Sequence, residues 1–211
     1  PDDFVEFSAR VRHEHDLRGF EWYDMIKHEG LREKDMMWAK YPSDEEILEV
    51  GVRGLYIGNF FKWDPIRQTE LVKEKYGWKQ SEKPFERTYR LMSNLDDRYE
   101  NGIHDLMKFV KFGYGRASDH ASKDIRTGDM TREEGIEMVK KYDAVVSSDL
   151  YHWLDYVDMT EEEFWKIADS FRDPRVWWIQ DGLWWKDNIW GGTSSYGEVK
   201  LPKDQWYKYI N

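Results

Sequence analysis

Apolar residues recur at helical spacing along much of this chain. Two stretches carry that spacing as a continuous stripe, and each stripe predicts a helix with one buried face. The stripes are Ile103, Leu106, Met107 and Val110 within residues 99–112, and Phe164, Ile167, Ala168 and Phe171 in the stretch after Thr160. We expect both helices to pack against the core through these residues.

Helix start signals divide the rest of the chain. Ser43, Thr131 and Thr160 are each followed three residues later by Glu, which is the pattern of a capping box. Asp64 precedes Pro65, a residue suited to the first helical turn, and Gly77 follows as a stop signal. Further helices are expected around residues 10–15, 20–27, 65–76, 117–126 and 148–157.

Strand signals are sparse. Residues 52–61 are β-branched, aromatic and punctuated by Gly, which makes them the best strand candidate. A short strand is expected around Tyr89–Met92, and one or two more in an otherwise irregular Trp- and Gly-rich tail over residues 174–211. The expected fold class is mainly α with a small β element. The expected divisions are residues 1–50, 51–173 and 174–211.

Composition limits the classes of function. The chain has no Cys, which excludes disulfides and thiolate metal sites within it and fits a cytoplasmic location. With 42 acidic and 32 basic residues the formal net charge is −10, and no long basic run occurs, so nucleic acid is not an expected partner. No stretch approaches the roughly 20 apolar residues of a membrane span.

Candidate chemistry gathers around a glycine turn at residues 112–115. Before the turn, His104, Lys108 and Lys111 fall on one helix face, roughly opposite the apolar stripe. After it come Arg116 and then a second shared face formed by Asp119, Ser122 and Arg126. Glycine turns at helix N-termini beside cations suit anionic groups, phosphate above all. A phosphate or nucleotide-sugar pocket is one interpretation; a solvated basic face beside a glycine cap is the other.

Within that pocket the residues take distinct expected roles. His104, Lys111 and Arg116 are the catalytic candidates: Lys111 and Arg116 as anion binders, and His104 as a proton carrier because an imidazole titrates near neutrality. Substrate and phosphate contacts are expected from Lys108, Gly113, Tyr114, Gly115, Asp119, Ser122 and Arg126.

Two weaker candidates lie outside the turn. Asp96 and Asp97 offer hard oxygen ligands for Mg²⁺, although such a loop pair is more often solvated. The pairs Trp177-Trp178 and Trp184-Trp185 offer either a platform for stacking sugar rings or simple packing of the tail.

The stretch from Phe112 to Arg126, with Gly128 and the Thr131-Arg132-Glu133-Glu134 box, resembles the signature of the N-acetyl sugar amidotransferases. Shorter matches, such as Tyr56-Ile57-Gly58 and His104-Asp105, extend the resemblance over residues 29–190. That family is similar to PP-loop ATP pyrophosphatases, whose fold is α/β and of the adenine nucleotide alpha hydrolase type. The chain would then be the helical C-terminal part of such an enzyme.

The resemblance implies conversion of a sugar acetamido group to an acetamidino group during surface polysaccharide (O-antigen) synthesis. ATP with Mg²⁺ would adenylate the amide oxygen, and ammonia from a glutaminase partner would displace AMP from the nucleotide-sugar substrate. The family's Ser-Gly-Gly-x-Asp-Ser loop and cysteine cluster do not occur here. Residues 1–50 are therefore expected to lead in from a missing nucleotide-binding half, and the chain alone to be inactive. The alternative function is a non-enzymatic module that binds carbohydrate or a protein partner through a Trp-rich surface.

Overall fold

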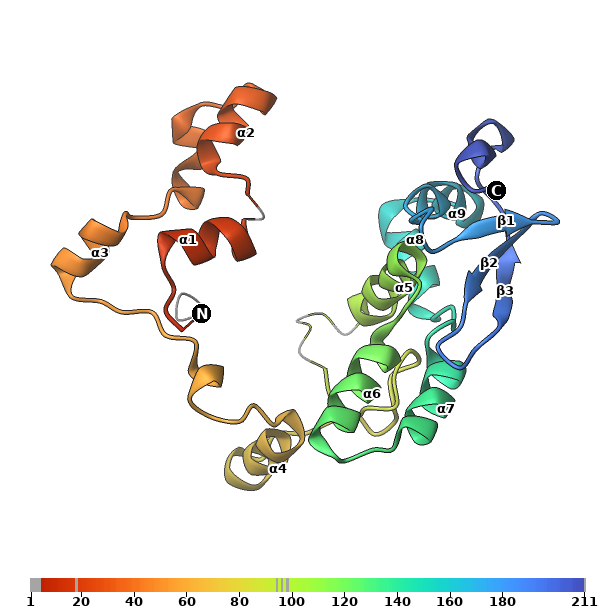
Figure 1. The fold of residues 1–211 in the computed structure, drawn as a ribbon, viewed down its shortest axis with the longest axis horizontal. Coiled ribbons are helices and arrows are strands. Elements are labelled where there is room, and N and C mark those ends of the chain that lie inside the picture. The colour runs from red at the N-terminus through yellow and green to blue at the C-terminus, as the bar shows by residue number, and fades with distance from the viewer. Residues whose placement is uncertain (1–4, 18, 94, 96, 98, 211) are drawn as a thin grey trace. The chain divides into compact units, whose positions relative to one another are not determined.

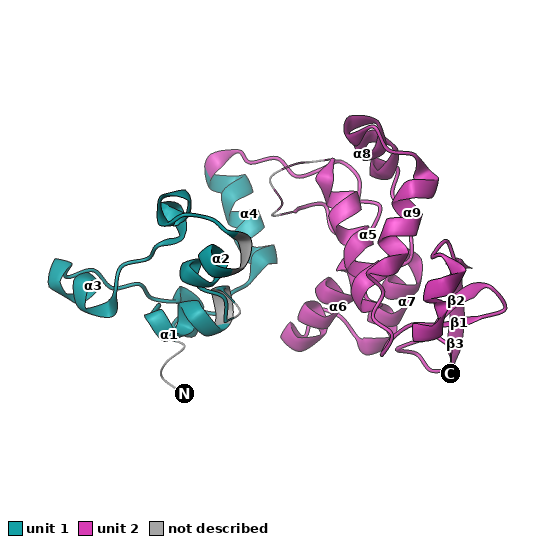
Figure 2. Ribbon diagram, turned by 90° about the horizontal axis from the view of Figure 1, so that it is seen from above, with its two compact units in different colours: residues 1–75 teal, residues 76–211 magenta. Residues whose placement is uncertain are grey.

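The computed structural model describes residues 5–17, 19–93, 95, 97 and 99–210. The chain forms two compact units, residues 1–75 and 76–211, and each is described by itself (Figure 2). This division falls at a different place from the boundaries expected after residues 50 and 173. Those boundaries separated functional roles rather than compact bodies, so they stay predictions.

The first unit consists of short helices joined by loops (Figure 1). Its helices are α1 (Ala9–Val11), α2 (Trp22–Glu29), α3 (Asp44–Val50) and α4 (Pro65–Tyr76), with π-helical Arg12–Asp16 and 3₁₀ helices Glu33–Ala39 and Ile57–Asn59. Ser43 accepts the Glu46 N–H and the Glu46 side chain accepts the Ser43 N–H, which confirms the first capping box. Val11 and Met36 are the apolar side chains buried in the described part of this unit.

The strand expected over residues 52–61 is wrong. Leu55 forms one isolated antiparallel bridge with Glu6, and the chain then turns into the 3₁₀ helix Ile57–Asn59. Between the described parts of the two segments, the Phe7 N–H donates to the Gly54 carbonyl at 2.9 Å and the Tyr56 N–H donates to the Val5 carbonyl at 3.0 Å. A β-branched run without a longer partner strand leaves its backbone groups unpaired, so it does not stay extended.

The second unit is a set of helices with a small sheet. Its helices are α5 (Glu100–Phe112), α6 (Arg116–Thr127), α7 (Arg132–Tyr142), α8 (Asp149–Val157) and α9 (Glu161–Ser170). Helix α6 packs against α7, while α5 contacts α6, α8 and α9. Capping boxes at Thr131 and Thr160 open α7 and α9 as expected. No helix in the described part of the chain has the length and apolar character needed to cross a membrane.

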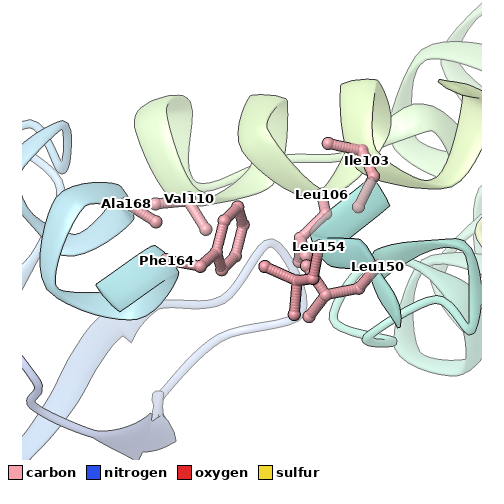
Figure 3. Packing of buried hydrophobic residues seen from close by; sticks show 7 residues of the cluster. All are labelled: Ile103, Leu106, Val110, Leu150, Leu154, Phe164 and Ala168. Atoms are coloured by element: carbon pink, nitrogen blue, oxygen red, sulfur yellow. The ribbon is translucent and has the colours of Figure 1, made fainter. Parts of the chain in front are cut away.

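The first core of this unit lies between α5, α8 and α9 (Figure 3). It contains Ile103, Leu106 and Val110 of α5, and Met107 packs against it, so the predicted α5 stripe is confirmed. The α9 stripe is confirmed only in half: Phe164 and Ala168 are buried, whereas Ile167 and Phe171 are 50% and 52% exposed. Helix α9 packs on α5 and α8 through the narrow face that carries Phe164 and Ala168. The side chains beside that face, Ile167 and Phe171, therefore stay in solvent.

The second core lies under the sheet that follows. Strands β1 (Trp178–Gln180), β2 (Leu183–Asp187) and β3 (Thr193–Glu198) form an antiparallel sheet in the order β1-β2-β3. Trp177 and Trp184 are almost fully buried there, and the guanidinium of Arg172 lies 4.3 and 4.7 Å from their ring centres. The prediction of an irregular tail with one or two strands is therefore wrong: three strands form one sheet, because tight turns let each strand pair with the next.

The segment before α5 is held in place by side-chain contacts and not by the backbone hydrogen bonds of a β-sheet. The strand expected at Tyr89–Met92 is wrong, since the described residues there are irregular. Arg90 pairs with Asp124 of α6, and the Tyr89 hydroxyl donates to the same carboxylate. Overall, the structure is mainly helical with a small antiparallel sheet, as the expected fold class states.

Candidate functional site

The glycine turn between α5 and α6 is fixed by steric demands on both glycines. Gly113 ends α5 with φ +74°, a left-handed conformation that favours glycine, and its N–H donates to Phe109 at 2.8 Å. A Cβ on Gly113 would lie 2.5 Å from Val176, and one on Gly115 would lie 2.8 Å from the Asp143 carboxylate. The two glycines therefore allow the Val176 side chain to lie against the turn at Gly113 and the Asp143 carboxylate to lie against it at Gly115.

A protein carboxylate already occupies the N-terminus of α6. Asp143 is buried, and its carboxylate accepts the Gly115 N–H at 2.8 Å, the Ser118 N–H at 3.1 Å and the Ser118 hydroxyl at 2.6 Å. The start of a helix favours negative charge, and Asp143 supplies it from the end of α7. Gly115 therefore does not offer its N–H to a phosphate, contrary to the sequence interpretation.

On the outer side of the turn, Arg116 joins α6 to α5. Its guanidinium donates to the buried Asp105 carboxylate at 2.8 Å, and a terminal nitrogen lies 3.2 Å from His104 Nδ1. His104 Nδ1 is also 3.0 Å from Asp105 Oδ1. When Nδ1 carries a proton it donates to Asp105, and when it does not it accepts from Arg116. The imidazole, 47% exposed, thus keeps a partner in either state and remains open to solvent.

A second ion pair extends this cluster. Lys108, one turn after His104 on α5, pairs with Asp119 of α6. The Lys108 ammonium also lies 4.8 Å from the ring centre of Tyr114 in the turn. The structure therefore gathers five predicted residues at the junction: His104, Lys108, Tyr114, Arg116 and Asp119.

The other predicted cations lie elsewhere. Lys111 is exposed, with its ammonium 5.1 Å from the Phe112 ring centre. Arg126 bonds Ser122 at 3.2 Å near the far end of α6, about 15 Å along the helix from Arg116. Arg126 therefore does not share a cavity with Arg116, because a shared helical face does not place two residues at the same height on the helix; a role for Lys111 stays a prediction.

Behind the junction lies a neutral histidine. His120 Nδ1 is 2.6 Å from the Thr88 hydroxyl. Burial lowers the pKa of His120 to about 3, and the nearby cations Arg90, Arg116, Lys123 and Lys108 act in the same direction. His120 is therefore uncharged at neutral pH and serves as a half-buried contact between α6 and the preceding segment.

A buried arginine stands behind Asp143. Arg87 is 1% exposed, donates to the Asp143 carbonyl and lies 5.7 Å from the Phe109 ring centre. Its Nε and one terminal nitrogen have no hydrogen-bond partner among the described residues. Burial lowers the pKa of Arg87 to about 10, while Asp143 and Asp105 raise it.

Sequence reasoning assigned no chemistry to Arg87, Asp105 or Asp143. Asp105 belongs to the short His104-Asp105 match, and that match was the only signal for it. Asp143 lies 28 residues from Gly115, and no spacing rule connects the two.

The fit to Mg²⁺ and ATP is poor at these residues. Asp96 lies outside the described residues, and Asp97 uses its carboxylate to accept the N–H groups of Tyr99 and Glu100 at the start of α5. The described residues hold no group of three or more His, Asp or Glu side chains placed for a metal. Since Asp143 fills the start of α6, the turn does not form a phosphate cradle.

Comparison with known proteins bears on the same segment. Residues 93–189 match the family model described as LPS biosynthesis protein WbpG-like, C-terminal domain. The match contains the glycine turn, the cluster around Arg116 and Asp143. Comparison with curated proteins gives no match. The segment from residue 93 to residue 189 therefore belongs to the WbpG-like C-terminal domain family.

Proposed function

We propose that this chain takes part in lipopolysaccharide biosynthesis as the C-terminal part of an ATP-dependent N-acetyl sugar amidotransferase. In that reaction the oxygen of a sugar acetamido group is replaced by the nitrogen of ammonia, giving an acetamidino group. The family match to LPS biosynthesis proteins supports the pathway. The resemblance of residues 112–134 to the amidotransferase signature supports the reaction.

One observation supports a chemical role for the junction. Arg116 is held by the buried Asp105 and presents one guanidinium nitrogen to the half-exposed His104. A fixed guanidinium is a rigid donor for anionic or carbonyl oxygens, and a neighbouring imidazole transfers protons near neutral pH. In the proposal, Arg116 orients the sugar or its phosphate and His104 carries a proton. Because the junction does not fit Mg²⁺ or ATP, no step through them is assigned to these residues.

The test is conversion of a nucleotide-linked N-acetyl sugar by the complete gene product, supplied with ATP, Mg²⁺ and an ammonium salt. Mass spectrometry detects replacement of oxygen by an NH group. His104→Ala should lower kcat by about 10² or more, the usual contribution of a general acid or base. Arg116→Ala should lower kcat/KM, with partial rescue in Arg116→Lys if charge alone is needed.

Arg175→Ala is the matched control. Arg175 is 88% exposed and pairs with Asp173 two residues before it, so its loss should leave turnover unchanged. Unchanged turnover in both His104→Ala and Arg116→Ala would remove the junction from the site. No conversion by a folded gene product with glutamine or ammonium, over a panel of nucleotide-linked N-acetyl sugars, would refute the reaction itself.

The alternative, a non-enzymatic module that binds through Trp side chains, has mixed support. Trp177 and Trp184 are core residues and offer no platform. Their neighbours Trp178 and Trp185 are half-buried and face each other across β1 and β2. Binding of neutral glycans that is lost in Trp185→Ala, without any conversion, would favour this alternative.

A further inference from the structure

Asp105 is the buried charge of the cluster that His104 and Arg116 form at the junction of α5 and α6. Its side chain is 5% exposed, whereas that of His104 is 47% exposed. Oδ1 of Asp105 accepts from the Arg116 Nε–H at 2.8 Å and lies 3.0 Å from His104 Nδ1. Within the described residues, Arg116 and His104 are the side chains that hydrogen-bond this carboxylate. Since a carboxylate has about four acceptor positions, Asp105 has room for both donors.

His104 Nδ1 lies between an acceptor and a donor, and one proton can satisfy only one of them. With Nδ1 protonated, the ring donates to Asp105, and Nη2 of Arg116 loses an acceptor. With Nδ1 unprotonated, the ring accepts from Nη2 at 3.2 Å, and its lone pair then faces Oδ1 of Asp105 at 3.0 Å. The two tautomers of the neutral imidazole therefore differ in which neighbour lacks a partner.

Burial decides between the two tautomers. Arg116 Nη2 also lies 2.8 Å from Oδ1 of Asp105, and its contact with His104 is on the exposed side of the cluster. This nitrogen therefore keeps an anion beside it without the imidazole. Asp105 has no such alternative, because a buried acceptor that loses a donor does not gain a water in its place. A hydrogen bond to a carboxylate is also the stronger one, so the arrangement favours a proton on Nδ1.

We propose that Asp105 is a positioning residue that holds the neutral imidazole of His104 as its Nδ1–H tautomer. Nε2 is then the basic nitrogen, and no residue in the described part of the chain hydrogen-bonds it. The half-exposed ring thus presents one proton acceptor, in an orientation that the Nδ1 hydrogen bond fixes. That Nε2 serves a reaction rests on the proposed function, whereas the tautomer rests on the contacts alone.

NMR of the ¹⁵N-labelled chain distinguishes the two ring nitrogens, through long-range correlations with the carbon-bound ring protons. The spectrum is taken at about pH 8.5, two units above the ordinary pKa of imidazole. The variant His104→Gln identifies the His104 signals among those of the six His residues. The wild type should show a protonated Nδ1 and an unprotonated Nε2. A wild type protonated mainly at Nε2 would overturn the proposal.

Asp105→Asn tests which neighbour sets the tautomer. It leaves a neutral acceptor, so the guanidinium of Arg116 becomes the stronger partner of Nδ1 and Nε2–H should become the major form. Asp119→Asn is the matched control, because it removes the neighbouring carboxylate that pairs with Lys108 and should leave Nδ1 protonated. An unchanged tautomer in folded Asp105→Asn would contradict the role of Asp105.

A second variant keeps the proposal falsifiable if Asp105→Asn does not fold. Arg116→Met removes the donor that competes for Nδ1 and leaves the carboxylate in place. Because buried Asp105 then depends still more on the imidazole, Nδ1 should keep its proton. Conversion of the ring to Nε2–H in folded Arg116→Met would show that Asp105 does not hold the tautomer.

The complete gene product tests the consequence for turnover. In Asp105→Asn, kcat should fall in proportion to the remaining Nδ1–H form, about tenfold if one tenth remains. KM should change less, because Asn keeps an acceptor for Arg116. An unchanged kcat in Asp105→Asn whose tautomer has changed would overturn the use of Nε2 as a base. If the tautomer is as expected but the complete gene product converts no N-acetyl sugar, only the proposed function fails.

Discussion

Asp143 should be one of the most sensitive positions in the second unit. Asp143→Ala removes the acceptor of three hydrogen bonds from Gly115 and Ser118 and takes away a carboxylate that raises the pKa of buried Arg87. Each buried donor left without a partner costs about 1–3 kcal/mol, and loss of a helix N-terminal acceptor costs about 0.5–2 kcal/mol. Breaking a buried ionic arrangement costs about 3–5 kcal/mol.

These contributions overlap, because the same carboxylate makes all of them. The expected loss in the free energy of unfolding is therefore about 3–5 kcal/mol for Asp143→Ala and not their sum. Asp143→Asn keeps one acceptor oxygen at the same position and should lose less. Urea unfolding followed by tryptophan fluorescence measures the change, because the buried Trp177 and Trp184 lie in the same unit.

Glu162→Ala is the matched control. Glu162 pairs with Lys166 on the surface of α9, where the pair is exposed, and its removal should give no measurable change. A loss below about 1 kcal/mol for Asp143→Ala, with the m-value unchanged, would contradict the assignment of Asp143 as the anion that anchors α6.

Three other predictions concern single sites. Because the unfolded imidazole of His120 binds a proton near pH 6.5 and the folded one only near pH 3, wild-type stability should fall as the pH drops through this window. His120→Asn should flatten that fall in urea titrations at several pH values; an unchanged slope would show that His120 is protonated in the fold. Gly128→Ala should lower the free energy of unfolding by about 1–2 kcal/mol through its φ of +84° alone. Gly113→Ala should lower the free energy of unfolding by about 1–3 kcal/mol more than Gly128→Ala, because its Cβ also meets the Val176 side chain. Equal losses of unfolding free energy in the two variants would contradict the close approach at Gly113. Leu106→Ala should cost about 2–5 kcal/mol and Ile167→Ala under about 1 kcal/mol in the same unfolding assay, and the reverse order would contradict the observed core.

Much of the helical framework was readable from the sequence because its signals are local. The three boxes at Ser43, Thr131 and Thr160 join groups three residues apart, and each forms in the structure. The α5 stripe repeats within a single helix, so periodicity alone identified its buried face. The glycine turn was recognised for the same reason.

The candidate site was predicted only in part. Helical spacing in the sequence placed His104 and Lys108 on one side of α5. Across the turn, the structure brings His104 to Arg116 and Lys108 to Asp119. Periodicity gives the direction of a side chain around a helix but not its partner on another element. Arg126 therefore shares the expected face of α6 and still lies far from the junction.

By itself, the sequence determined the helices, their starts and the glycine turn, since these depend on contacts within a few residues. The tertiary structure decided which strands paired, which Trp side chains entered the core, and that Asp143 rather than a ligand occupies the start of α6. It also placed Lys186 beside the turn, 73 residues from Gly113 in the chain. Such placements depend on burial and charge pairing between distant segments, and no local pattern encodes them.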